Sequence, residues 1–325
     1  MALNALDLAV LEKDSLKKGI MFAMFKSALP SPMDFLGVEN AQSLSQDVIR
    51  MTDPGTPSTR NLNDTVTAYQ AQFTRGSETL KIIENKVVID PTFLDVKTYV
   101  QDPVTTQTKA YAKVVRTTIN DLFLNGDPGS DVTQPAGLDY RLRNDADFNG
   151  QAIDSTNIDV DGSDELRNTW LDQIDESIQQ ANSMANQIIV NKQTHLKLRS
   201  ALRNLKILDT TKDQFDRKIF TYGDSKIIDA GQKPAGVITG AAADQVIGND
   251  STTGIFGDAS STPMYFVNTT GEESVKLLQL HSFRVKNLGI NPNNPAEVII
   301  QVKWVIGFLV PQKFSISSLD GLDIS

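Results

Sequence analysis

The chain has 325 residues, 40% of them hydrophobic and 22% charged, so it can bury a large core and is not disordered overall. Its 31 basic and 40 acidic residues give a net charge of −9, which argues against a dedicated DNA or RNA binder, because such proteins neutralise phosphates with lysine and arginine. The absence of cysteine excludes disulfides and cysteine-ligated metals, and the longest apolar runs, 20–25 and 304–310, are too short to span a bilayer.

The first 60 residues are predicted to form a helix and then an extended arm. Apolar side chains recur at helical spacing over 2–28, and Pro30 and Pro32 end that pattern. From there to about Arg60 the chain is polar and rich in turn residues, which is typical of a segment that lies on a neighbouring molecule rather than of a folded domain.

The following stretch changes to the alternating pattern of β-strands. Apolar side chains alternate over 69–73 and again over 80–83, on either side of Arg75-Gly76-Ser77, which predicts a hairpin with its turn at 75–77. A second pair of strands is expected at 86–90 and 94–100.

Residues 103–124 are predicted to form one long helix. Asp102-Pro103 supplies an N-cap and a proline in the first turn, Tyr111 and Val115 belong to an apolar stripe, and Asn125-Gly126 marks the C-terminal end. At 1.5 Å per residue the helix would be roughly 33 Å long, which is more than a compact domain usually needs.

The second half of the chain is predicted to mix helices and strands. A helix at about 164–181 with Ser163 as its N-cap, a strand at 187–190 and a helix at about 194–205 indicate a separate α+β domain. Residues 223–262 are rich in glycine and are expected to be loops with at most one short strand. Apolar residues alternate over 298–310, which predicts a strand of roughly 43 Å, well above the usual length.

The residues that could carry chemistry give little sign of a site. His195 and His281 are far apart in the sequence and are interpreted as structural, and the common hydrolase and nucleotide-binding fingerprints are absent. Asn157 to Gly162 matches the first half of a calcium loop, but Asn168 stands where a bidentate glutamate is needed, so we expect a turn before the next helix rather than a metal site involving Asp159 and Asp161. We predict no catalytic, cofactor or metal site, and no enzyme.

An arm, a projecting hairpin, a long helix and a very long strand together describe an elongated body with projections. A compact enzyme has little use for projections whose apolar residues stay uncovered, whereas a self-assembling subunit buries them on its neighbours.

Three parts of the sequence, in this order, resemble the major capsid proteins of tailed bacteriophages with the Hong Kong 97 type fold, over most of 60–325. They are the strand pair Glu84 to Asp90 and Leu94 to Val100; the helix Tyr111 to Gly126 with the following Gly137-Leu138; and the C-terminal segments Pro263 to Val267, Val285 to Gly289, Val302 to Pro311 and Ile316 to Gly321.

The resemblance implies an α+β fold with four parts. These are an N-terminal arm at 1–59, an extended loop at 60–92, a peripheral domain from 93–126 and 271–310 with a spine helix at about 103–124, and an axial domain from 127–270 and 311–325.

The function implied by the resemblance is that of a structural subunit, without cofactor, which assembles into pentamers and hexamers of an icosahedral head around phage double-stranded DNA. The shell would line the DNA only non-specifically, and the protein would be found in the virion, and in the host cytoplasm during assembly. Many relatives begin with a removable scaffolding segment, whereas this chain has room only for the arm, so we expect a separate scaffolding protein as well as a portal, and no membrane partner. The alternatives are the shell protein of a bacterial encapsulating nanocompartment, or a cytosolic α+β enzyme with an unfamiliar site.

Candidate inter-subunit contacts lie in the loop region, where the apolar members are expected to contribute to association and little to the chain's own core. They are Tyr69, Phe73, Arg75, Glu78, Leu80, Lys81, Ile82 and Lys86. Lys81 and Lys86, with Asn287, Asn291, Asn293 and Glu297, also have the residue types of the lysine–asparagine crosslink that some members of that family form. Such residue types are common, so solvated side chains are the favoured interpretation.

Overall fold

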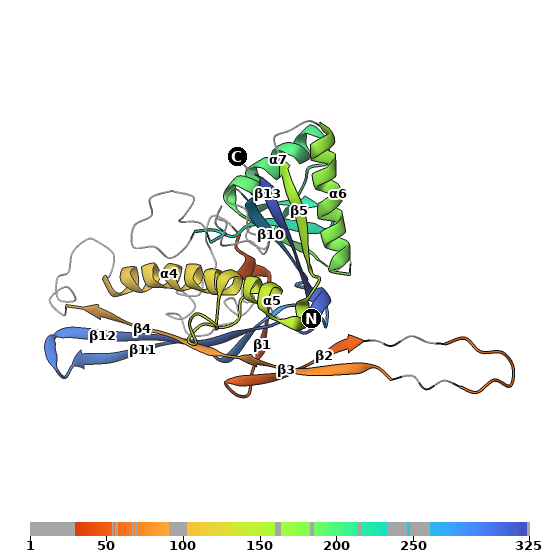
Figure 1. Cartoon of the computed structure of the whole chain (residues 1–325). Helices are drawn as coiled ribbons and strands as arrows, with labels where there is room; N and C mark the ends of the chain where they lie inside the picture. Colours follow the sequence, from red (N-terminus) through yellow and green to blue (C-terminus); the bar gives the residue numbers. More distant parts are fainter. Residues whose placement is uncertain are drawn as a thin grey trace.

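The computed structural model describes residues 30–53, 55, 58–66, 68, 70–90, 103–159, 164–182, 185–213, 216–232, 246–247 and 261–323. These residues form an α+β structure with a four-stranded sheet, a seven-stranded sheet and a two-stranded ribbon (Figure 1). The helix predicted at 2–28, the strand predicted at 94–100 and the N-cap Ser163 lie outside the described residues.

The four-stranded sheet has the order β1-β11-β12-β4. Its strands are β1 (Gly37–Asn40), β11 (Lys276–Asn291), β12 (Asn294–Leu309) and β4 (Lys81–Ile89). β11 and β12 form a long antiparallel hairpin of 16 residues each, β4 pairs with the other edge of β12, and β1 runs parallel to the start of β11. The very long strand predicted at 298–310 is confirmed as β12.

Helix α4 (Pro103–Asn125) lies along this sheet, which confirms the long helix predicted at 103–124 (Figure 1). Alternate residues of β12 are buried in one cluster with the apolar stripe of α4, and the rings of Phe123 and Phe308 are 5.1 Å apart. The helix ends at Gly126, where the chain returns so closely that a Cβ atom would lie 2.3 Å from the carbonyl oxygen of Pro135. Glycine is therefore required there by close backbone approach.

The seven-stranded sheet has the order β5-β13-β10-β6-β9-β8-β7. Its strands are β5 (Ala152–Asp159), β13 (Ile316–Asp323), β10 (Ser261–Val267), β6 (Gln187–Val190), β9 (Ser225–Asp229), β8 (Lys218–Tyr222) and β7 (Asp209–Lys212). Helices α6 (Asp164–Gln180) and α7 (Lys192–Asn204) share a buried cluster with it, which includes Trp170, Leu198 and Phe266. The strand predicted at 187–190 and both predicted helices are confirmed.

The turn predicted at the calcium half-loop is corrected by the structure. Residues 157–159 were expected to form a turn, but they belong to β5, where Ile158 pairs with Leu322 and Asp159 with Asp323 of the parallel strand β13. Pairing with a neighbouring strand holds this backbone extended, which the short motif could not reveal. Asp161 and Gly162 lie outside the described residues.

The ribbon consists of β2 (Ser45–Asp53) and β3 (Gln72–Thr79), which are antiparallel and project away from both sheets (Figure 1). The turn predicted at 75–77 is therefore wrong, and the arm predicted up to Arg60 contains a strand. A Cβ atom on Gly76 would lie 2.5 Å from Nη1 of Arg50, so this glycine makes room for a side chain on the opposite strand instead of bending the chain. β4, expected as the other half of the hairpin, pairs with β12 instead.

Candidate interaction surface

The outward face of the ribbon carries three exposed apolar side chains and one ion pair, and no described residue covers it. We define this face by Asp47, Ile49, Met51, Phe73 and Arg75, which occupy alternate positions and pair as Ile49 with Arg75 and Met51 with Phe73. Ile49 is 67% exposed and Phe73 is 62% exposed, and an ion pair joins Asp47 to Arg75. An isolated two-stranded ribbon is marginally stable in water, so such a face fits contact with another molecule.

The inward face of the ribbon root packs on the body, by which we mean the two sheets and their helices. Val48 of β2 is buried in a cluster with Leu80, Leu278, Val305 and Leu309. Leu80 joins β3 to β4, and its N–H donates to the carbonyl of Leu44 at 2.8 Å. The root of the ribbon thus belongs to the core of the chain itself.

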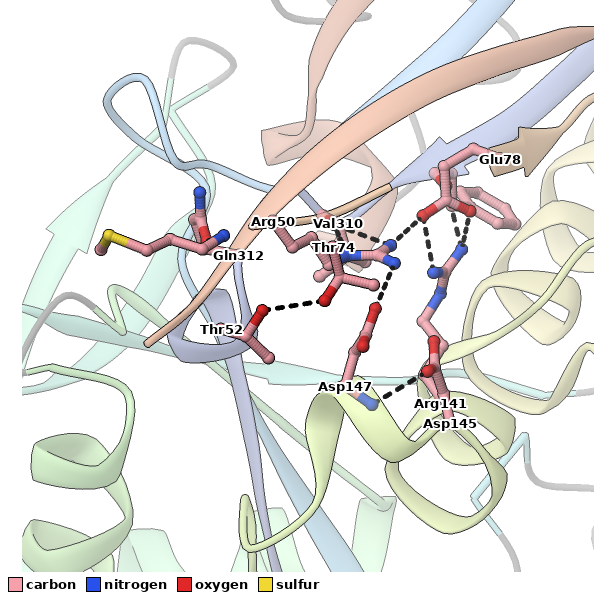
Figure 2. A network of polar contacts seen from close by, with 11 residues as sticks. Arg50, Thr52, Thr74, Glu78, Arg141, Asp145, Asp147, Val310 and Gln312 are labelled. Carbon is pink, nitrogen blue, oxygen red and sulfur yellow. Dashed lines mark hydrogen bonds and ion pairs between the residues drawn. The ribbon is translucent and has the colours of Figure 1, made fainter. Parts of the chain in front are cut away.

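A buried network of charges also lies at the ribbon root (Figure 2). Oε1 of Glu78 accepts hydrogen bonds from Arg50 at 2.6 Å and from Arg141 at 2.7 Å, and its Oε2 accepts one from Arg141 at 2.5 Å. Arg50 is in β2, Glu78 in β3, and Arg141 in α5 (Leu138–Asn144). Because two charge-assisted bonds in parallel fix both distance and plane, the Arg141–Glu78 pair holds the ribbon root in one orientation.

Arg50 extends the network to the end of β12. Its guanidinium donates to the carbonyl of Val310 at 3.2 Å and to Asp147 at 3.1 Å, and lies 5.0 Å from the ring centroid of Phe148. The side chains of Arg50, Glu78 and Arg141 are 4–6% exposed, whereas that of Asp147 is 21% exposed. Removing one partner of a buried ion pair strands the other charge and costs about 3–5 kcal/mol.

A second charged cluster fixes the start of the described chain. Asp34, in the short helix η1 (Pro32–Phe35), accepts hydrogen bonds at 3.0 Å from Arg116 of α4 and at 3.0 Å from Arg217. Burial raises the pKa of the Asp34 carboxyl, and the two guanidinium groups oppose that shift. These bonds tie η1 both to α4 and to the segment before β8.

The predicted contact residues differ in how far the chain itself covers them. Phe73, Arg75, Ile82 and Lys86 are exposed, whereas Lys81 is half-buried and donates to the carbonyl of Val132 at 2.6 Å. Tyr69 lies outside the described residues.

The structure corrects the prediction that Glu78 and Leu80 are inter-subunit contacts, because each residue is only 4% exposed in the single chain. Glu78 binds the two arginines within the chain, and Leu80 packs in the chain's own core. Their types suit an interface, but two arginines cover Glu78, and residues of β12 pack on Leu80.

Sequence reasoning missed Ile49 and Met51 on the outward face and Arg50 on the inward face. The run Ile49-Arg50-Met51 alternates, but with the charge on the buried side, which reverses the usual half-buried strand pattern. Only the pairing of β2 with β3 shows which side is covered.

Two of the remaining predicted side chains, His195 and Asn291, have partners within the chain, whereas His281, Asn287 and Asn293 are exposed. His195 lies edge-on to Phe220 at 5.8 Å, and burial lowers the pKa of its imidazole. At the end of the β11–β12 hairpin, Asn291 donates to Glu297 at 2.7 Å. In the parts of the chain that the structure describes, no group of three histidine or acidic side chains could hold a metal, and no helix is long and apolar enough to cross a membrane.

Comparison with known proteins finds matches only among solved structures. No protein-family profile and no curated protein matches the sequence. The capsid of a native GTA particle matches with a TM-score of 0.57 and 13% identity over 92% of this chain and 89% of that one. Mycobacterium phage Cain matches with a TM-score of 0.58 and 10% identity over 100% of both chains.

This chain has the Hong Kong 97 type capsid fold. An encapsulin complex from Synechococcus elongatus PCC 7942 shares it, with a TM-score of 0.61 and 12% identity over 89% of this chain and 86% of that one. The projecting ribbon of this chain begins at Ser45, because β2 supplies half of it. The extended loop at 60–92 stays a prediction.

Proposed function

We propose that this chain is a major capsid protein, a non-enzymatic subunit that assembles into pentamers and hexamers of an icosahedral phage head around double-stranded DNA. Its fold supports this proposal, because phage Cain matches over the full length of both chains. In this proposal the four-stranded sheet with α4 is the peripheral domain, the seven-stranded sheet is the axial domain, and the ribbon is the extended loop.

The observation that carries the proposal is the outward face of the ribbon. Ile49, Met51 and Phe73 are exposed on a strand pair that the described body contacts only from the inward side. Burying such side chains on another copy would contribute about 1.5–3 kcal/mol each. A heterologous contact of this kind, repeated around a ring, closes into a capsomer when the rotation fits.

The proposed partners follow from the same assembly. A separate scaffolding protein and a portal would act with the chain in the host cytoplasm, and the finished shell would line packaged DNA without sequence-specific contacts. DNA phosphates attract basic surfaces, so a chain with a net charge of −9 is expected to line packaged DNA only weakly and non-specifically.

A second candidate function is the shell of a protein compartment. The encapsulin complex has the same fold, and the ribbon would serve both kinds of shell equally well. Packaged nucleic acid distinguishes the two, because a phage head contains nuclease-protected DNA and an encapsulin-type shell contains protein cargo.

Electron microscopy of the purified full-length chain, expressed alone and in infected or scaffold-expressing cells, tests the proposal. We expect rings or closed shells of megadalton mass, and Ile49→Asp with Phe73→Asp should give folded but unassembled protein. Val132→Asp is a matched control, because Val132 is an exposed apolar residue outside the ribbon. A monodisperse monomer or dimer under every condition would contradict the capsid function.

A further inference from the structure

The ribbon is bonded to the body at its root and at no described point beyond it. The outermost bond to the body that the structure shows is from the N–H of Met51 to Oε1 of Gln312 at 3.2 Å. Further out, β2 and β3 contact each other, as in the Thr52–Thr74 hydroxyl pair at 2.8 Å. The direction of the whole projection is therefore decided by the contacts around Arg50 and Glu78.

Glu78 occupies the centre of those contacts. Its carboxylate receives Arg50 from the other ribbon strand and Arg141 from α5, and Arg141 also donates to the carbonyl of Phe308 at 3.1 Å. One carboxylate thus joins the ribbon, α5 and the end of β12. An apolar contact would tolerate sliding, whereas these bonds lose strength when their angles change.

We infer that Glu78 is the positioning residue of the ribbon: by joining Arg50 to Arg141 it sets the direction in which the outward face is presented to a second copy of the chain. Presentation to a second copy rests on the proposed function, whereas the effect of Glu78 on direction is a property of the single chain.

Gly76 leaves the space that the guanidinium of Arg50 occupies. It lies opposite Val48, and the guanidinium of Arg50 passes so closely that a Cβ atom would lie 2.5 Å from its Nη1. A side chain at this position displaces Nη1, which binds Asp147, and so shifts the guanidinium whose Nη2 binds Glu78, while leaving every charge in place. Because the displaced atoms are the far end of a flexible side chain, Gly76→Ala should fold.

The sequence offers a clean measurement, because it contains no cysteine. Spin labels on Gln72→Cys in the ribbon and Lys113→Cys in α4 report the direction of the ribbon in the unassembled full chain. A second pair, Lys113→Cys in α4 with Glu272→Cys in the connection between β10 and β11, lies outside the ribbon and reports the integrity of the body. Pulsed electron–electron double resonance then gives the distribution of distances between the two spin labels of each pair.

We expect Glu78→Gln and Gly76→Ala to broaden or shift the distribution of the ribbon pair and to leave that of the body pair unchanged. Asp47→Asn is the matched control, because it removes an ion pair within the ribbon that does not touch the body. If Glu78→Gln also broadens the distance distribution of the body pair, the result for Gly76→Ala decides whether the inference holds. An unchanged ribbon distribution in Gly76→Ala, or equal broadening in Asp47→Asn, overturns the inference.

Assembly of the same variants separates this inference from the proposed function. Loss of shells together with a broadened ribbon distribution supports both. Normal shells with a broadened distribution keep the positioning role of Glu78 and contradict the contact through the ribbon.

Discussion

The two faces of the ribbon reverse the usual distribution of side chains. The inward face buries Arg50 and Glu78, whereas the outward face exposes Ile49, Met51 and Phe73 to solvent. In a chain that functions alone, the opposite arrangement would be more stable, because burying charge is costly and burying apolar surface is favourable. The difference indicates that the inward face fixes geometry and that the outward face provides association.

The largest effect is expected on the inward face. Arg141→Met keeps the aliphatic stem but leaves Glu78 with one guanidinium instead of two, so we expect a loss of about 3–5 kcal/mol in the free energy of unfolding. Urea denaturation followed by circular dichroism measures this loss. A change below about 1 kcal/mol would show that the network is no more than a surface ion pair.

A smaller loss is expected from the apolar part of the same face. Val48→Ala removes two methyl groups from the cluster with Leu80 and Leu309, which should cost roughly 1–3 kcal/mol. Thermal unfolding provides the measurement. A loss equal to that of Arg141→Met would remove the distinction between charge and packing at the root.

On the outward face, Ile49→Ser and Phe73→Ser should change the unfolding free energy of the single chain by less than about 0.5 kcal/mol, because both side chains are exposed. Assembly, followed by light scattering, should nevertheless be lost. Destabilisation of the single chain by either variant would mean that the outward face packs on the chain itself.

The outward ion pair sharpens the same comparison. Asp47 and Arg75 are both exposed, so Asp47→Asn should lower the free energy of unfolding far less than Arg141→Met, and less still in high salt. Denaturation at low and high ionic strength tests this. A cost as large as that of a buried pair would contradict our distinction between the faces.

The smallest effect is expected from His195. This residue lies outside the ribbon, and its protonation contributes a background to any acid denaturation of the chain. Burial lowers the pKa of His195 below its ordinary 6.5, so the folded chain keeps this imidazole neutral while the unfolded chain takes up a proton first. Its contribution to stability is present above about pH 6.5 and is lost as the pH falls through the folded pKa. Between pH 7 and about pH 5, the melting temperature of His195→Gln should therefore fall less than that of the parent chain. An equal fall in both chains would mean that other groups cause the acid sensitivity.

Local patterns in the sequence were enough to predict α4, α6, α7, β6 and β12. In each, the side-chain period of a helix or strand agrees with the burial that the fold later imposes. Asn125-Gly126 also marks the end of α4 correctly, because capping depends on neighbouring residues. Of these elements, the resemblance to capsid proteins depended on α4 and β12, in their order with segments such as 84–90 and 316–321.

The ribbon and its network were decided by tertiary structure alone. The short run around Gly76 fits a turn as well as a strand, and the choice is made by Arg50, which is distant in sequence and lies across it. Likewise Glu78 and Leu80 look like surface residues until α5 and β12 cover them. Burial of these side chains depends on segments more than 60 residues away, such as Arg141 at a separation of 63, and no local pattern encodes that proximity.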